Sequence, residues 1–377
     1  MLAKVNEALV ADIPSSTFVT CFYAILDPKS ATLSYANAGH DLPYVRRRGG
    51  GPEELRATGM PLGLIPGIGY EEKETILAPG DSALFYSHGL VEAHSLDTLG
   101  SIQNPAHYCG VYGMRPTEHR VPMSGVFFHD PVLKFRIMSV AGPMARSVAD
   151  LRLALRIIAG PDGLDTGVPP VPLRDVRRPE VRTLRIAWSS EFPESSTQDE
   201  IRTVLEGVVR ELAAEGAMVE ECIPDVDLRH QYELSEELFD LIAGTFPVES
   251  AVFSEQASVA SKEEHSSLEA YLIALDRRDE VMRAWEQFLG DWDVLIMPAG
   301  TNTAERHDEE TSEPEEYPYA PSAVSGCPMV VIPVGVDQQG LPFGLQIIGK
   351  RWDDERLLDI AESVSQLTGG FRRPPGY

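Results

Sequence analysis

The sequence has no long apolar run and few cysteines. No segment approaches the roughly 18 consecutive apolar residues of a membrane-spanning helix, and no charged-then-apolar signal segment opens the sequence. Its four cysteines lie far apart and show no metal-ligand spacing: Cys21, Cys109, Cys222 and Cys327. This favours free thiols in a reducing compartment over a disulfide framework. The prediction is a soluble cytoplasmic protein that does not enter a membrane.

Basic residues are also scarce. The sequence has 32 Lys and Arg residues against 58 Asp and Glu residues, which gives a formal net charge of -26. Nucleic acids and anionic membrane surfaces are bound by clustered Lys and Arg. We therefore expect neither as a partner. The run Arg46 to Arg48 adjoins three glycines and is most simply a solvated loop.

Residues 1–95 have the pattern of strands and turns. Three β-rich runs, Phe18 to Leu26, Ala31 to Ala36 and Leu42 to Val45, are separated by residues that favour turns. A further hairpin-like pair of strands is predicted around Pro79-Gly80-Asp81, which has the composition of a tight turn. This part is therefore predicted to be a β-rich domain.

Residues 96–377 alternate between helical and strand patterns. Ser147 with Asp150, and Thr197 with Glu200, have the spacing of capping boxes at two helix starts. The pattern predicts strands near 183–189 and 217–222 joined by a helix over 198–215, a long helix over 263–289, and buried strands near 293–299 and 330–334. A strand-helix-strand crossover implies a partly parallel sheet covered by helices. The predicted fold class is α/β.

Four ordered segments from Asp97 onward carry a family resemblance. They are "DTLGSIQNPAHYCGVYGMRPT", "GPMARSVADLRLALRIIAGPDG", "DVLIMPA" and the stretch from Ser322 to Ala361. In this order they resemble the amidase signature family over residues 97–377, without the family's N-terminal part. The resemblance implies a mixed sheet flanked by helices and cleavage of the C–N bond of small carboxylic amides through a serine acyl-enzyme, with no cofactor and no metal.

The resemblance also implies roles for individual residues. Ser101 matches the family's nucleophile, and the backbone N–H groups of Thr98, Leu99, Gly100 and Ser101 match its oxyanion hole, which stabilises the tetrahedral intermediate. Leu99 stands where the family commonly has Gly, and Gln103 where it commonly has Arg.

The base that would activate Ser101 has no match in the sequence. The family takes it from a lysine and a second, cis-peptide serine in Gly- and Ser-rich segments upstream of the nucleophile. The lysines before Ser101 are Lys4, Lys29 and Lys73, and none lies in such a segment. We therefore expect an impaired enzyme, or one that depends on a separate chain carrying these segments.

Two histidines are the nearest alternative bases in sequence. His107 lies inside the family's "NPAHYCG" block, where a structural role is favoured. His119 lies in a loop and has no carboxylate partner that the sequence identifies.

Residues 5–94 resemble part of a bacterial PPM-type serine/threonine phosphatase of the sigma-regulator kind. The resemblance rests on "TFVTCFYAILDPKSATLSYANAGHDLPYV", "GMPLGL" and "LAPGDSALFYSHGLVEAH". Such enzymes hold two divalent cations on aspartates. Here His88 occupies one aspartate position, two other aspartate blocks have no match, and Asp41 and Asp81 are interpreted as turn formers. Phosphatase chemistry is therefore not expected.

The two resemblances meet near residues 95–97 without a linker, which predicts a partial phosphatase-like domain over 1–95 and the C-terminal part of an amidase domain over 96–377. A gene rearrangement, a sequence-assembly artefact or a deliberate recombination would each produce such a junction. The alternatives to an impaired amidase are a non-catalytic fusion whose phosphatase-like part binds a protein partner, and a non-functional chimera.

Overall fold

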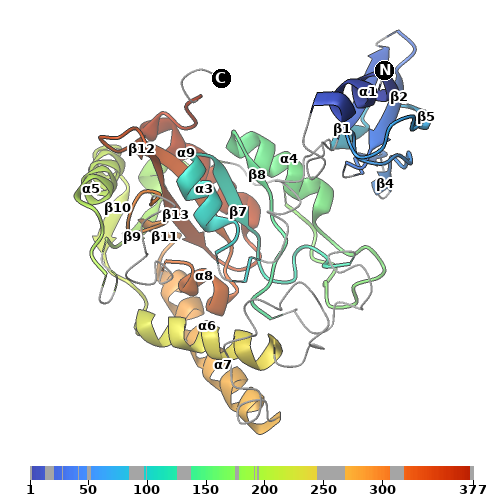
Figure 1. Ribbon diagram of the computed structural model, residues 1–377. Helices are drawn as coiled ribbons and strands as arrows, with labels where there is room; N and C mark the ends of the chain where they lie inside the picture. The colour runs from blue at the N-terminus through green and yellow to red at the C-terminus, as the bar shows by residue number, and fades with distance from the viewer. Residues whose placement is uncertain are drawn as a thin grey trace. The chain divides into compact units, whose positions relative to one another are not determined.

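The computed structural model divides the chain into two compact units, Met1–Glu92 and Ala93–Tyr377. Each is described by itself (Figure 1). The described residues are 2–12, 21–27, 29–40, 42–48, 52–84, 97–98, 100–124, 137–174, 178–190, 192, 195–243, 268–305 and 318–373.

The first unit contains one described helix and two small antiparallel sheets. The helix is α1 (Leu2–Asp12). One sheet has the order β1 (Cys21–Asp27), β2 (Thr32–Ala38), β5 (Glu72–Ile76), and the other the order β4 (Pro52–Glu54), β3 (Tyr44–Arg46), β6 (Ser82–Leu84). The three predicted β-rich runs therefore contain strands within their described residues.

The predicted hairpin around Pro79-Gly80-Asp81 is wrong. The turn itself forms, with the Asp81 carboxylate accepting a hydrogen bond from the Ala78 N–H at 3.0 Å. However, β5 pairs with β2 and β6 pairs with β3. The turn residues fix where the chain reverses, whereas contacts far along the chain decide which strand is paired.

A seven-stranded mixed sheet forms the centre of the second unit. Its order is β10 (Met218–Glu221), β9 (Arg185–Trp188), β11 (Val294–Pro298), β13 (Pro342–Gly349), β12 (Met329–Val336), β7 (Tyr112–Arg115), β8 (Met144–Ala145). Strands β10, β9 and β11 are parallel, and the remaining pairs are antiparallel. The mixed sheet of the predicted fold class is confirmed.

Helices cover both faces of this sheet (Figure 1). Because successive side chains of a strand point to opposite faces, Val294 and Ile296 enter one apolar cluster, while Leu295 and Met297 enter the other. The first cluster includes residues of α4 (Val148–Ile158), α5 (Asp199–Ala214) and α9 (Asp354–Thr368), and the second includes residues of α3 (Gln103–Cys109), α6 (Leu228–Ala243), α7 (Leu268–Asp291) and α8 (Ala320–Ser325).

The predicted crossover unit is confirmed, since α5 joins the parallel strands β9 and β10. Its predicted cap is wrong. The N-cap residue is Gln198, and the Thr197 hydroxyl instead donates to the Ser190 carbonyl at 2.6 Å. At α4 the prediction holds, because the Ser147 side chain accepts from the Asp150 N–H.

The described part of the predicted long helix is α7, and residues 263–267 lie outside the described ranges. A short 3₁₀ turn, Val181–Thr183, precedes β9. Of the helices described, none combines the length and apolar character required to cross a bilayer.

Two glycines give a matched test of the packing. A Cβ added at Gly142 would lie 2.0 Å from the Met114 carbonyl oxygen, whereas one at Gly207, inside α5, meets nothing within 4 Å. We expect Gly142→Ala to lower the free energy of unfolding by more than about 2 kcal/mol, because the backbone must move. Gly207→Ala should raise it by up to about 1 kcal/mol through helix propensity. Urea unfolding followed by tryptophan fluorescence measures both, and equal effects would contradict the packing described.

Candidate active site

The Gly100-Ser101 loop stands directly before α3. Asp97, Thr98 and Gly100 are buried, while Ser101 is exposed. Gly100 has a φ of +86°, and a Cβ added there would lie 3.3 Å from both the Asn104 side chain and the Tyr319 Cβ. Glycine therefore suits this position for both its conformation and its close contacts. The loop presents the Ser101 hydroxyl to solvent.

The buried Arg115 side chain fastens this loop to the sheet. From β7 its guanidinium donates to the Asp97 carbonyl at 2.5 Å and to the Met138 carbonyl at 2.6 Å. Next to it, the Thr98 and Ser139 hydroxyls lie 2.7 Å apart in a buried hydrogen bond. The start of the loop and the segment around residue 138 are thus held against the same strand.

The Asp97 carboxyl lies inside this arrangement. Burial raises the pKa of Asp97, and Arg115 and the backbone N–H groups of Gly100, Ser101 and Ile102 oppose that rise. Two N–H groups predicted to form an oxyanion hole, those of Gly100 and Ser101, therefore interact with a carboxyl of their own loop. Of the other two predicted positions, Thr98 lies in the same loop, and Leu99 lies outside the described residues.

The buried face of α3 joins the loop to the carboxyl end of β11. The Gln103 side-chain amide donates to the Ala299 carbonyl at 2.7 Å. His107 lies one turn further along α3 and is also buried. Ser101 is therefore placed at the sheet edge where β11 ends.

His107 makes contacts expected of a structural residue. Its Nε2 lies 2.8 Å from the Asn302 carbonyl, and its Nδ1 accepts from the Gly344 N–H at 3.0 Å. Burial lowers the pKa of His107, which favours the neutral ring. With both ring nitrogens bound to the backbone, His107 has no free nitrogen with which to deprotonate Ser101.

His119 has a carboxylate partner, contrary to the expectation from sequence. Its Nε2 lies 3.3 Å from the Glu118 carboxylate, which is buried and also paired with Arg278. Burial opposes ionisation of Glu118, but Arg278 and His119 more than compensate and lower its pKa to about 2. The sequence did not identify Glu118 as a buried carboxylate, because its ion pair is with Arg278 of the distant helix α7.

The described part of the second unit contains one lysine that could be considered as a base, Lys350, which directly follows β13. Because β13 is antiparallel to β11, with Gly349 opposite Val294, Lys350 lies at the edge where β11 begins. Gln103, at the start of α3 directly after the Ser101 loop, contacts the other edge at Ala299. Lys134 and Lys262 lie outside the described residues, and Lys4, Lys29 and Lys73 belong to the first unit.

No group of three His, Cys, Asp or Glu side chains in the described residues could hold a metal ion. In the first unit Asp81 also accepts from Arg47 and from the Arg48 N–H, which is consistent with a turn former. His88 and Asp41, which the sequence analysis also considered, lie outside the described residues.

Comparison with known proteins identifies the family. The amidase family profile matches residues 80–358, and this chain belongs to that family. A second profile, stage II sporulation protein E (SpoIIE), matches residues 1–109.

The relatives found by sequence include A-subunits of glutamyl-tRNA(Gln) amidotransferases. The protein from Moorella thermoacetica is 29% identical over 315 residues, which cover 74% of this chain and 63% of the relative. The one from Staphylococcus carnosus is 29% identical over 325 residues, covering 76% and 66% respectively. This chain thus spans about two thirds of the length of these relatives.

Solved structures support the fold. The A-subunit of the Thermotoga maritima glutamyl-tRNA(Gln) amidotransferase superposes with a TM-score of 0.62 at 23% identity, over 74% of this chain and 64% of that chain. Fatty acid amide hydrolase superposes with a TM-score of 0.60 at 22% identity, over 73% of this chain and 56% of that chain.

The burial of His107 predicts a pH effect on stability. Because its pKa is lowered on folding, the unfolded chain takes up a proton below about pH 6.5 that the folded chain does not. Stability is therefore retained at higher pH and lost as pH falls. Between pH 7 and 5.5 we expect the wild type to lose about 1 kcal/mol more unfolding free energy than His107→Gln, in urea titrations followed by tryptophan fluorescence. Parallel pH profiles for the two proteins would show that the ring is not held neutral.

Proposed function

We propose that this chain is an amidase-family hydrolase in which Ser101 attacks the carbonyl carbon of a small-molecule carboxylic amide. The exposed Ser101 hydroxyl on a loop held by buried Arg115 is the observation that carries the proposal. In the reaction, the C–N bond breaks as the acyl group passes to the serine oxygen, and water then releases the carboxylate. Thr98, Leu99, Gly100 and Ser101 are proposed to supply the oxyanion hole through their backbone N–H groups.

We further propose that the reaction is slow in this chain because no described side chain is placed to act as the base for Ser101. The serine proton must leave as the oxygen attacks, and the departing nitrogen must gain one. His107 is bound by backbone groups at both ring nitrogens, His119 is paired with Glu118, and Lys350 lies at the opposite sheet edge. Loss of the activating base costs about 10⁴- to 10⁶-fold in serine hydrolases.

The missing base could come from a separate chain. The relatives from Moorella and Staphylococcus are named as subunits, which supports the idea of a partner. The proposed partner carries the lysine and cis-serine segments that the sequence resemblance implies, and it would pack beside the Ser101 loop. Under this proposal the domain boundary lies near residue 96, and the part of the amidase domain before it is absent from this chain.

The first unit suggests a second candidate function, a non-catalytic protein-binding module. The SpoIIE match over residues 1–109 favours it. In the described part of this unit, Asp27 accepts from the Lys29 N–H and from Ser30, and Asp81 binds Arg47, so both carboxylates are engaged locally. Such a fusion would bind a protein partner without phosphatase turnover.

Substitution of Ser101 tests the amidase proposal. Simple amides should be hydrolysed by the wild type at a rate barely above background, and Ser101→Ala should change that rate little, because an unactivated hydroxyl contributes little to the rate. Adding in trans a family fragment with the lysine and cis-serine segments should raise the rate in the wild type but not in Ser101→Ala. The exposed Ser196→Ala variant is the matched control and should behave as the wild type.

Two outcomes would oppose this proposal. One is full amidase activity of the lone chain that Ser101→Ala abolishes, which would show that a base is present. The other is rescue by the fragment in Ser101→Ala, which would show that the activity belongs to the fragment.

Metal titration tests the second candidate. With local partners for Asp27 and Asp81, and His88 in place of an aspartate in the phosphatase pattern, calorimetry should find weak or no binding of Mg²⁺ or Mn²⁺. Tight stoichiometric binding accompanied by phosphoester hydrolysis would replace the binding-module proposal with a true phosphatase.

A further inference from the structure

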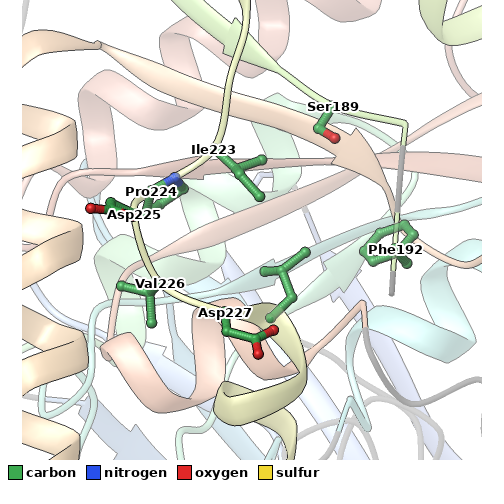
Figure 2. Close-up of a pocket in the computed structure, with 8 residues that line it drawn as sticks. Ser189, Phe192, Ile223, Pro224, Asp225, Val226 and Asp227 are labelled. Atoms are coloured by element: carbon green, nitrogen blue, oxygen red, sulfur yellow. The ribbon is translucent and has the colours of Figure 1, made fainter. Parts of the chain in front are cut away.

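A pocket of about 590 Å³ opens at the carboxyl ends of β9 and β10. Ser189 directly follows β9, and the loop from Ile223 to Asp227 connects β10 to α6. Figure 2 shows Ile223 to Asp227 along this loop, with Phe192 across the opening. Clefts at the carboxyl ends of parallel strands are common ligand sites in α/β proteins, and this volume lies in the range of small-molecule sites.

The pocket lies at the same sheet edge as the Ser101 loop. Strand β9 is the parallel neighbour of β11, and the Ser189 N–H donates to the Ile296 carbonyl at 3.1 Å. Three residues after Ile296, the Ala299 carbonyl accepts the hydrogen bond from Gln103. The pocket therefore lies at the ends of β9, the neighbour of β11, and of β10 beyond it, while the end of β11 contacts Gln103 of α3.

The lining is mostly apolar and carries negative charge on the loop between β10 and α6. Five of the eight lining residues carry carbon side chains: Phe192, Ile223, Pro224, Val226 and Leu228. Two of the remaining three, Asp225 and Asp227, carry exposed carboxylates. Among the described residues the lining contains neither Lys nor Arg, so an anionic ligand would meet like charge there.

We propose that this pocket binds organic ammonium ions that carry a small apolar group. The apolar group would pack against Phe192 and Ile223, and the negative charge of Asp225 and Asp227 on the loop would attract the ammonium group. Amide hydrolysis produces one carboxylate and one amine, which is protonated near neutral pH. If the proposed function holds, the pocket receives the amine side of the cleaved bond and disfavours the carboxylate side.

The experiment compares three probes that share a ring and differ in charge. Benzylammonium, benzyl alcohol and benzoate are titrated into the full chain, and binding is followed by calorimetry. We expect benzylammonium to bind most tightly and benzoate most weakly. Added salt should weaken the binding of benzylammonium but leave the binding of benzyl alcohol unchanged. Equal affinity for benzoate and benzylammonium would overturn the proposal.

Variants locate the binding. Asp225→Asn and Asp227→Asn should each lower the affinity for benzylammonium by about threefold to fivefold, which is the effect of losing a partly exposed ion pair. The Asp227 carboxylate accepts a hydrogen bond from the Arg229 N–H at 3.0 Å. Because the side chain of asparagine also has an oxygen that can accept this bond, the start of α6 should persist in Asp227→Asn. Asp199→Asn removes the same charge from an exposed side chain on α5, outside the pocket lining, and should have no effect. Unchanged binding in the Asp225→Asn/Asp227→Asn double variant would also overturn the proposal.

The binding measurement is independent of turnover. Ser101→Ala should bind benzylammonium as the wild type does, because Ser101 is not part of the lining. If benzylammonium fails to bind while the rescued enzyme cleaves amides through Ser101, the pocket assignment fails and the function stands. If benzylammonium binds but Ser101 takes no part in amide cleavage, the pocket assignment holds and the proposed amidase reaction does not.

Discussion

The arrangement around Ser101 depends on one buried cation. Arg115 is almost fully enclosed, and a guanidinium in that position is stable only with acceptors for its N–H groups. It finds them on the Asp97, Met138 and Ser322 carbonyls, which belong to three separate parts of the chain. These acceptors must stay in place for Arg115 to remain satisfied. The geometry of the Ser101 loop is therefore a by-product of satisfying the N–H groups of a buried cation.

A second buried pair extends this constraint away from the loop. Glu118, three residues beyond Arg115, pairs with Arg278 of α7 and accepts from the Met138 N–H at 3.0 Å. Arg278 also donates to the Val324 carbonyl of α8 at 3.0 Å. Breaking a buried ion pair costs about 3–5 kcal/mol, so α7, α8 and the segment around Met138 are expected to move little relative to β7.

The sequence was a good guide where the signal is local or periodic. The β9–α5–β10 crossover follows from apolar spacing, and Ser147 was recognisable as a helix cap from its own neighbourhood. It was a poor guide where the outcome depends on distant partners. Thr197 looks like a cap, yet its hydroxyl bonds to Ser190, and β5 looks like half of a hairpin, yet it joins β2. Short motifs contain no information about which distant carbonyl or strand competes for a group.

The same distinction applies to the site. Ser101 and Gly100 were singled out through the family resemblance of the segment "DTLGSIQNPAHYCGVYGMRPT", and in the fold Gly100 has a left-handed backbone next to an exposed serine. Arg115 and Asp97 were missed as anchors, although a charged residue at the end of a strand as apolar as "GVYGM" is a usable signal. Such a residue must be paired when buried, and the carbonyls that pair with it become visible only in the folded chain.

The contacts that hold the Ser101 loop are distinct from the proton transfer that would activate its serine. Arg115 binds a backbone carbonyl of the loop, and Gln103 and His107 bind backbone carbonyls that follow β11. Because all three side chains are buried, these contacts contribute to the stability of the fold whether or not the chain is catalytically active. None of them exchanges a proton with Ser101 in these contacts. A serine oxygen becomes a competent nucleophile only as its proton is removed, and this step depends on a side chain of matched pKa, not on the shape of the loop. A loop of this family can therefore remain well formed whether or not a base stands beside its serine.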